Sequence, residues 1–451
     1  MKSELAYGID FGTTNSTISF VRNGHAETVP LDTGAKQPDV FRSVMYIRPD
    51  STITFAHEAI DNYLRDIAKN DAKVRKQIFT GQFIQLDKPI IGDGGWAGVE
   101  MVPEMIEVDV GEEGRLLMGL KSALSTNIIP NMNIYGRFYS LERLLGIMLA
   151  EMKKRADKIV GENVTCAVVG RPVHFVGEND ALAQERLTEA VHIAGFTDIR
   201  FEFEPIGAAW DYGTSVTDRK HKVIVFDFGG GTLDFSIVSF PEHEIIYNDG
   251  IGIGGDLINT EFFEAQIAQY FGSEATFGTS KMPLPSAIRL ALKNWYSISQ
   301  LKTENFLQML SKLRDATDQK EALGNLRTLV VHNLGYALYQ SIDNAKIALS
   351  DRSEYDYQFE YAAIDIKKGI TRPSFEQSIC HIVDEISNKI DEIQERSHIS
   401  WSEVDYVVTT GGSSLIPIVR FMLEAKIGKG KLVKQETFTS VAKGLALRAN
   451  S

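Results

Sequence analysis

The sequence predicts a two-lobed α/β protein in which each lobe begins with a similar glycine-rich β-hairpin. The first hairpin has Asp10 at the end of an apolar strand, followed by a turn over residues 11–16. The second has Asp227 near the end of an apolar strand over residues 223–228, followed by a turn over residues 229–232. A chain of 451 residues is also too long for one hydrophobic core, so at least two lobes are expected.

Both turns have the chemistry of an anion site with its counter-cation. Glycine lacks the Cβ atom that would keep a ligand away from the backbone, so N–H groups in these turns can approach an anion closely. An aspartate at the strand end can hold a hard cation, directly or through its waters. Two such hairpins in one chain predict a clamp that grips a polyphosphate from both sides. A plain hairpin turn is the alternative for either segment taken alone.

The rest of the first lobe alternates strands and helices. Asn23-Gly24 predicts a tight turn in a meander, because both residues tolerate positive φ. The spacing of apolar residues then predicts a helix over 141–160, a buried strand over 164–169 and a helix over 181–194.

The second lobe repeats this order, which indicates a structural duplication rather than a short tandem repeat. Its expected elements after the hairpin are a helix over 257–270, mostly helical structure over 275–350, a long helix over 375–395, a strand over 404–409 and a Gly-rich turn over 411–414.

The composition is that of an ordinary soluble globular protein, with 43% hydrophobic and 24% charged residues. A formal net charge of −13 argues against a surface built for nucleic acid or an anionic membrane. The two cysteines, Cys166 and Cys380, have no metal-ligand spacing and predict free thiols in a reducing compartment. Without room for a signal peptide or a bilayer-spanning apolar stretch, a cytoplasmic location is expected.

Further motifs follow one another along the chain. Residues 204–213 read EPIGAAWDYG, Gly254-Gly255-Asp256 follows the second hairpin, residues 370–376 read ITRPSFE, and residues 409–417 read TTGGSSLIP. With the two hairpins, these segments resemble the nucleotide-binding part of the DnaK-type (seventy-kilodalton heat-shock) chaperones, within the actin and sugar-kinase superfamily. The resemblance covers most of the chain and implies an actin-like ATPase fold. Each lobe would then have a mixed sheet flanked by helices around a ribonuclease-H-like core.

The resemblance also implies a division into lobes with inserted subdomains. Lobe I would be residues 1–215, with a core of 1–42 and 131–215 and an inserted subdomain at 43–130. Lobe II would be residues 216–451, with a core of 216–258 and 370–451 and an inserted helical subdomain at 259–369. The family's peptide-binding domain has no counterpart after the expected last helix, so a short stand-alone relative is expected.

By this resemblance, ATP or ADP with Mg²⁺ would lie between the lobes. Asp10 and Asp227 would hold Mg²⁺ through its waters. Glu204 and Asp234 would complete the polar ring around the metal and the attacking water, so Glu204, Asp227 and Asp234 form the expected catalytic set. The expected phosphate contacts are Gly12, Thr13, Thr14, Asn15, Gly229, Gly230, Gly231 and Thr232.

The nucleoside side resembles the family less closely. Asp343, Lys346 and Ser350 lie at i, i+3 and i+7, hence on one helix face, and resemble the family's ribose and adenine contacts. Ile347 and Leu415 stand where the family has two arginines around adenine, and ordinary helix packing is an equal alternative for them. Phe438 stands where an Asp is usual. The other expected contacts are Gly255, Gly411, Gly412 and Ser413.

The family also uses a lysine near the attacking water. The segment that aligns with this lysine places Ile60 at its position. Lys121 is a candidate substitute, but a solvated surface lysine is the favoured interpretation of so short a match. Without such a lysine, hydrolysis would be slower than in the family, or absent.

The resemblance predicts an ATP-binding, chaperone-like protein with slow hydrolysis coupled to lobe closure. Its clients and cochaperones are not identified by the sequence, and no nucleic acid or membrane partner is expected. A sugar kinase of the same fold, in which a cleft carboxylate deprotonates a hydroxyl, is one alternative. A protein that assembles under the control of nucleotide is another.

Overall fold

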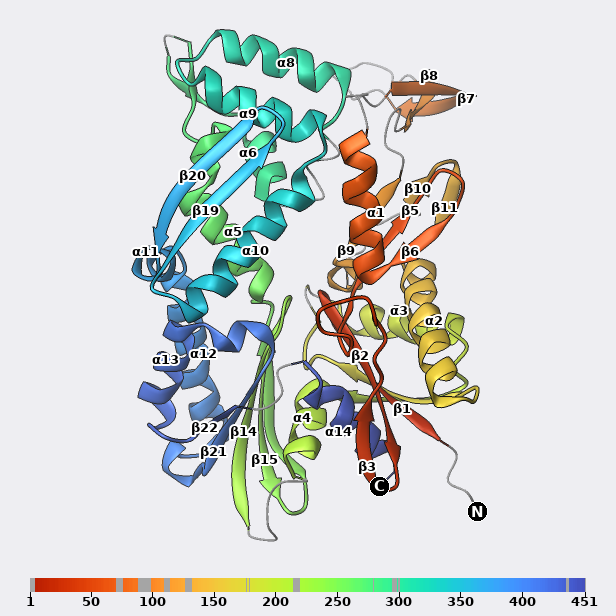
Figure 1. Cartoon of the computed structure of the whole chain (residues 1–451), viewed down its shortest axis with the longest axis vertical. Coiled ribbons are helices and arrows are strands. Elements are labelled where there is room, and N and C mark those ends of the chain that lie inside the picture. The colour runs from red at the N-terminus through yellow and green to blue at the C-terminus, as the bar shows by residue number, and fades with distance from the viewer. Residues whose placement is uncertain are drawn as a thin grey trace, which may run out of the picture.

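The computed structural model describes residues 5–69, 76–87, 99–108, 114–125, 132–175, 177, 179–213, 220–278, 280–293, 298, 301–434 and 438–450. Figure 1 shows two parts side by side, each with a sheet in its lower half and further elements above. We use lobe I for the part that carries the first sheet and lobe II for the part that carries the second. No helix within the described ranges is long and apolar enough to cross a membrane.

The two large sheets have the same topology, which confirms the predicted duplication. In each, a three-stranded antiparallel meander is followed by two strands parallel to its first strand. The lobe I order is β3 (His25–Thr28), β2 (Asn15–Arg22), β1 (Ala6–Phe11), β12 (Cys166–Arg171), β13 (Asp198–Phe203), with β4 (Phe41–Arg42) also pairing with β2. The lobe II order is β16 (Glu244–Ile251), β15 (Leu233–Phe240), β14 (His221–Phe228), β21 (Tyr406–Thr410), β22 (Leu432–Lys434).

The register of the two hairpins places the aspartates at equivalent points. Asp10 lies opposite Thr17 across β1 and β2, and Asp227 lies opposite Asp234 across β14 and β15. Both turns therefore lie at the carboxyl ends of the first strands of their sheets. This is the edge at which parallel α/β sheets place ligand sites.

Amphipathic helices cover each sheet and supply its core. In lobe I, Leu144, Leu145 and Met148 pack against Ile9 and Val169 of the sheet. The lobe I helices are α2 (Leu141–Val160) and α3 (Asp180–Ile193), and those of lobe II are α5 (Gly255–Gln266), α11 (Arg372–Ser378), α12 (Cys380–Ser397) and α13 (Pro417–Ile427). The long helix expected over 375–395 is wrong in one respect, because it is divided at Ile379 into α11 and α12.

Two helices lie between the sheets at the base of the molecule, α4 (Glu204–Gly213) and α14 (Ser440–Ala449) (Figure 1). They cross so closely that a Cβ atom on Gly444 would lie 1.6 Å from the Gly207 carbonyl oxygen. Apolar residues of α4, α14 and both sheets form one cluster, which includes Val168 of β12 and Val225 of β14. The two lobes therefore share a packed base through this crossing.

Smaller elements stand above the sheets. Those of lobe I are β5 (Val44–Ile47), β6 (Ile53–Phe55), α1 (Ala56–Lys69), β7 (Lys76–Asp87), β8 (Val99–Val108), β9 (Arg115–Met118), η1 (Leu120–Ala123), β10 (Met132–Ile134) and β11 (Arg137–Tyr139). Those of lobe II are η2 (Ala268–Phe271), β17 (Thr276–Phe277), β18 (Met282–Pro283), α6 (Ser286–Lys293), α8 (Glu304–Asp315), α9 (Lys320–Val331), α10 (Gly335–Asp351), β19 (Glu354–Tyr361) and β20 (Ile364–Thr371), while η3 (Trp401–Glu403) and η4 (Gly412–Leu415) flank β21.

The upper parts of the two lobes touch each other. The Tyr63 hydroxyl of α1 donates a hydrogen bond of 2.6 Å to the Asn333 carbonyl oxygen. The rings of Tyr63 and Tyr336 meet edge to face, with their centroids 5.9 Å apart. The lobes are thus joined above the two hairpin turns as well as at the base.

Candidate functional site

The two glycine-rich turns face each other across the space between the lobes. A Cβ atom on Gly230 would lie 2.5 Å from Oγ1 of Thr14, so the backbone of the second turn lies directly against the Thr14 side chain of the first turn. Oγ1 of Thr14 is buried and has no hydrogen-bond partner among the described residues. A buried hydroxyl without a partner is costly, which suits a site where a ligand supplies the missing hydrogen bond.

A cluster of charged side chains lies beside these turns. Nζ of Lys121 is 2.7 Å from Oε1 of Glu204, and both side chains are buried. Glu204 raises the pKa of Asp10, Asp227 and Asp234, whereas Lys121 lowers all three. The expected catalytic and metal residues therefore come together around one lysine.

The position of Lys121 corrects the sequence analysis. A solvated surface lysine was the favoured interpretation, but Lys121 is 8% exposed and is held in η1, against the first residue of α4. Its neighbour Leu120 belongs to the core of lobe I, which fixes the segment in place. Ile60 is also buried, within the apolar cluster above the sheets. Lys121 therefore lies where a lysine could serve this site.

Burial and mutual repulsion keep the aspartates from ionising easily. Burial, followed by the charge of Glu204, raises the pKa of Asp10 to about 7 and the pKa of Asp234 to about 7. The same two causes raise the pKa of Asp227 well above its ordinary value, and Asp10 and Asp234 add to the effect. Four carboxyl groups near one lysine repel one another, and a bound divalent metal would reduce that repulsion.

The residues present fit a hydrated Mg²⁺. In the part of the chain that the structure describes, no three acidic, histidine or cysteine side chains converge closely enough to hold a metal directly. Mg²⁺ commonly keeps several waters and takes only one or two carboxylates. Asp10 and Asp227 lie at the ends of β1 and β14, one in each lobe, and are the carboxylates that would hold such an ion.

The raised pKa values predict how the stability of the ligand-free chain depends on pH. An unfolded aspartate ionises near pH 3.9, whereas Asp10 and Asp234 ionise only at about pH 7 in the folded chain. Between these values the folded state holds more protons, so its stability falls as pH rises towards 7 and then levels off. Thermal melting from pH 5.5 to 8 should show this fall, and Asp234→Asn should reduce it. A melting temperature that rises steadily over this range, alike in both proteins, would contradict it.

Other glycine turns meet the turn of the second hairpin. The Gly255 amide donates to the Gly229 carbonyl oxygen at 3.0 Å, and the Ser413 hydroxyl donates to the same oxygen at 3.1 Å. A Cβ atom on Gly255 would lie 2.7 Å from Oγ of Ser413 and 3.3 Å from Nζ of Lys346. A Cβ atom on Gly411 would lie 2.3 Å from the Phe228 carbonyl oxygen. The turns that were expected to hold phosphate and nucleoside therefore form one continuous wall.

The expected nucleoside contacts are brought together in part. Nζ of Lys346 pairs with Oδ1 of Asp343 at 2.8 Å on α10, beside Gly255. The Ser350 hydroxyl donates to the Lys346 carbonyl oxygen at 3.0 Å, so it is committed to its own helix. Gly412 lies closest to the ring of Phe438, which a Cβ atom there would meet at 3.6 Å.

The structure also decides between the interpretations of Ile347. Helix packing into the core is wrong, because Ile347 is 55% exposed. Leu415 is half-buried at the end of η4. These are the aliphatic positions that stand where the resemblance places arginines.

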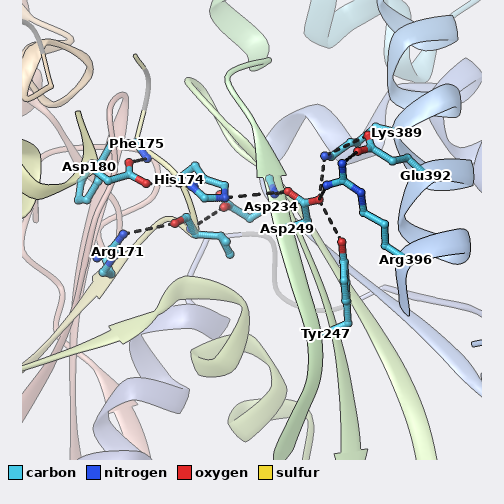
Figure 2. A network of polar contacts seen from close by, with 12 residues as sticks. Arg171, His174, Phe175, Asp180, Asp234, Tyr247, Asp249, Lys389, Glu392 and Arg396 are labelled. Atoms are coloured by element: carbon cyan, nitrogen blue, oxygen red, sulfur yellow. Dashed lines mark hydrogen bonds and ion pairs between the residues drawn. The ribbon is translucent and has the colours of Figure 1, made fainter. Parts of the chain in front are cut away.

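A polar network holds Asp234 from both lobes (Figure 2). The Val173 amide of lobe I donates to Oδ1 of Asp234 at 2.7 Å, and the Thr232 hydroxyl of lobe II donates to Oδ2 at 3.0 Å. The next side chain, His174, reaches 4.0 Å from Asp249 on β16. Sequence reasoning missed Val173, because a backbone donor leaves no signal in residue type.

A family model matches segments that contain part of this site. The family model described as "Hsp70 protein" matches residues 112–262 and 333–450, which is more than half of the chain. Those ranges contain Lys121, Glu204, Asp227 and Asp234.

Curated relatives match over nearly the whole chain at low identity. "Heat shock 70 kDa protein BIP3" of Oryza sativa subsp. japonica is 26% identical over 98% of this chain and 56% of its own length. "Chaperone protein DnaK" of Mycoplasmopsis synoviae is 23% identical over 95% of this chain and 55% of its own length. "Chaperone protein dnaK" of Cyanidioschyzon merolae is 24% identical over 98% and 61%, respectively. The chain thus spans little more than half the length of these relatives.

Proposed function

The chain belongs to the Hsp70 family, and from this premise we propose that it binds ATP and ADP with Mg²⁺ between its lobes and hydrolyses ATP slowly. The observation that carries the proposal is the pair of opposed glycine turns, with Thr14 against Gly230, beside a buried group of carboxylates and one lysine. Phosphoryl transfer requires little covalent chemistry from a protein. It requires charge neutralisation and an aligned nucleophile, which this arrangement can supply.

We assign roles by position in the site. The backbone of Gly229, Gly230 and Gly231 would cradle the phosphates, with Gly12, Thr13, Thr14, Asn15 and Thr232 beside them. Asp10 and Asp227 would hold Mg²⁺ through its waters, and the bound ion would neutralise phosphate charge. Glu204 and Asp234 would orient the attacking water, and Lys121 would fill the place of the family's lysine.

The nucleoside would lie along the wall formed by α5, α10 and η4. Asp343 and Lys346 would contact the ribose, with Gly255, Gly411, Gly412 and Ser413 lining the pocket. Ile347 and Leu415 would make aliphatic contact with the base in place of cation–π stacking. We also propose that lobe I comprises residues 1–215 with an insert at 43–130, and that lobe II comprises residues 216–451 with an insert at 259–369.

Lobe closure would be the output of nucleotide binding. The contacts of Tyr63 with Asn333 and Tyr336 join the lobes above the site, and their separation would open the space between the lobes to nucleotide. A protein client or cochaperone could respond to nucleotide only by binding the open and closed states with different affinity.

A turnover assay tests the proposal. With ATP and Mg²⁺, the chain is expected to release phosphate slowly, to stop when the metal is chelated, and to show no stimulation by a panel of sugars. A phosphorylated sugar would favour the kinase, and nucleotide-dependent pelleting would favour the assembling protein. Failure to bind either ATP or ADP would contradict all three.

A further inference from the structure

Arg42 lies beside the first glycine turn, on a short strand that sequence analysis did not connect with the site. Strand β4 pairs with β2 so that Arg42 lies opposite Asn15. The next residue is tied to the same turn, because the Ser43 amide donates to the Thr14 carbonyl oxygen at 2.9 Å and its hydroxyl to the Gly12 carbonyl oxygen at 2.8 Å. The backbone of Arg42 is therefore fixed to the turn proposed to bind phosphate.

The guanidinium of Arg42 lies beside the first turn and close enough to α10 of lobe II to act on Tyr336 and Asp343. Its Nη1 donates to Oδ1 of Asn15 at 3.2 Å. Its charge also acts on two carboxylates of lobe II. Burial would raise the pKa of Asp343, but Lys346 and Arg42 outweigh it and hold this pKa below its ordinary value. Burial raises the pKa of Asp256, and this rise is opposed by the hydrogen bond from Tyr339, then by the charge of Lys346 and, least, by that of Arg42.

These contacts place one cation between two groups that the proposed function gives to a nucleotide. Asn15 belongs to the phosphate turn, and Asp343 is the expected ribose contact. Asp343 does not depend on Arg42 alone, because it already has Lys346 at 2.8 Å and the Asn259 amide at 3.3 Å. An arginine offers a planar fork of donors that matches phosphate oxygens, and it stays charged at every physiological pH.

We propose that Arg42 is a phosphate-binding residue of this chain, which reaches from lobe I to the polyphosphate of a nucleotide whose ribose is held by lobe II. The inference rests on the proposed function and adds to it a contact outside the glycine turns. It also offsets a loss elsewhere in the site, because Ile347 and Leu415 bring no charge to the base. Nucleotide binding would then depend more on contacts with the phosphates than on contacts with the base, so the affinity would fall steeply as salt is added.

Calorimetric titration of Arg42 variants with ATP·Mg²⁺ and ADP·Mg²⁺, at low and moderate salt, tests this. Arg42→Ala is expected to weaken both affinities by roughly 10- to 100-fold, the range for losing hydrogen bonds to a charged group, and to flatten the salt dependence. Arg42→Lys should recover part of both effects, because it restores the charge without the fork. If Arg42→Ala does not fold by circular dichroism, Arg42→Gln keeps an amide donor for Asn15 and takes its place.

Arg22→Ala is the matched control. Arg22 lies on β2 about 23 Å from Asn15, at roughly 3.3 Å per strand residue, and pairs with Glu27 on the surface. The Arg22→Ala variant loses the same charge as Arg42→Ala, and it should bind both nucleotides as the parent does. If the parent and Arg22→Ala bind and Arg42→Ala stays within twofold, the inference fails and the proposed function stands. If Arg42→Ala weakens binding without changing its salt dependence, and Arg42→Lys binds no better, then Arg42 only positions Asn15 and the inference is overturned. If the parent binds neither nucleotide, the proposed function fails.

Discussion

Replacing Glu204 by Gln is expected to lower single-turnover ATP hydrolysis by roughly 10²–10³, the usual loss for one preorganised electrostatic group. Glu204 pairs with Lys121 and acts on the charges of Asp10, Asp227 and Asp234, so it stands at the centre of the cluster. Asp227→Asn should have an effect of similar size, because it removes a carboxylate proposed to hold Mg²⁺. The measurement is rapid quenching of labelled ATP with the protein in excess.

Glu403→Gln is the matched control for this prediction. Glu403 makes the same kind of pair, with Nζ of Lys222 at 2.6 Å, but on the surface of the molecule. Its substitution should leave the hydrolysis rate unchanged. If Glu204→Gln and Asp227→Asn also hydrolyse ATP at the parent rate, the roles assigned to these carboxylates are wrong.

Replacing Lys121 by Ala is expected to lower the free energy of unfolding of the ligand-free chain by about 3 kcal/mol, the lower end of the range for removing one partner of a buried ion pair. The lower end applies because the side chains of Lys121 and Glu204 remain 8% and 11% exposed. The loss has two sources, since Glu204 would be left without its cation and the three aspartates without the charge that lowers their pKa. Urea unfolding followed by circular dichroism measures it.

A double-mutant cycle separates the pair from simple loss of packing. Lys121→Ala with Glu204→Gln should cost less than the sum of the two single changes, because the carboxylate that Lys121 pairs with is removed together with the lysine. Lys222→Ala on the surface should cost no more than about 1 kcal/mol. If Lys121→Ala and Lys222→Ala lowered the free energy of unfolding equally, the buried pair would stabilise the fold no more than the surface pair.

The sequence predicted the parts of the site that depend on local chain chemistry. An aspartate at a strand end, followed by glycines, predicts a hairpin turn open to an anion. The structure places both turns at equivalent positions in the two sheets, at the ends of β1 and β14. The structural duplication was also predicted, because the second lobe repeats the order of elements of the first. Glu204 was expected from its resemblance to a family motif, and the structure places it beside Asp10 and Asp227.

What the sequence could not predict depends on contacts between distant segments. Lys121 looks like a surface lysine in its own segment, and only the packing of η1 against α4 buries it. Ile347 looks like a core residue, but the register of α10 exposes it. Arg42 belongs to a two-residue strand whose pairing with Asn15 has no sequence signal. No proline or glycine marks the division of the helix at Ile379.

Titration of ATP into the chain, with and without Mg²⁺, measures most directly whether the opposed turns hold one nucleotide and its metal. We expect one ATP per chain, with an affinity that rises on adding Mg²⁺. That gain should disappear both in Asp10→Asn, from lobe I, and in Asp227→Asn, from lobe II. Binding that ignores the metal, or a gain lost in only one of the two variants, would mean that the lobes do not share one site.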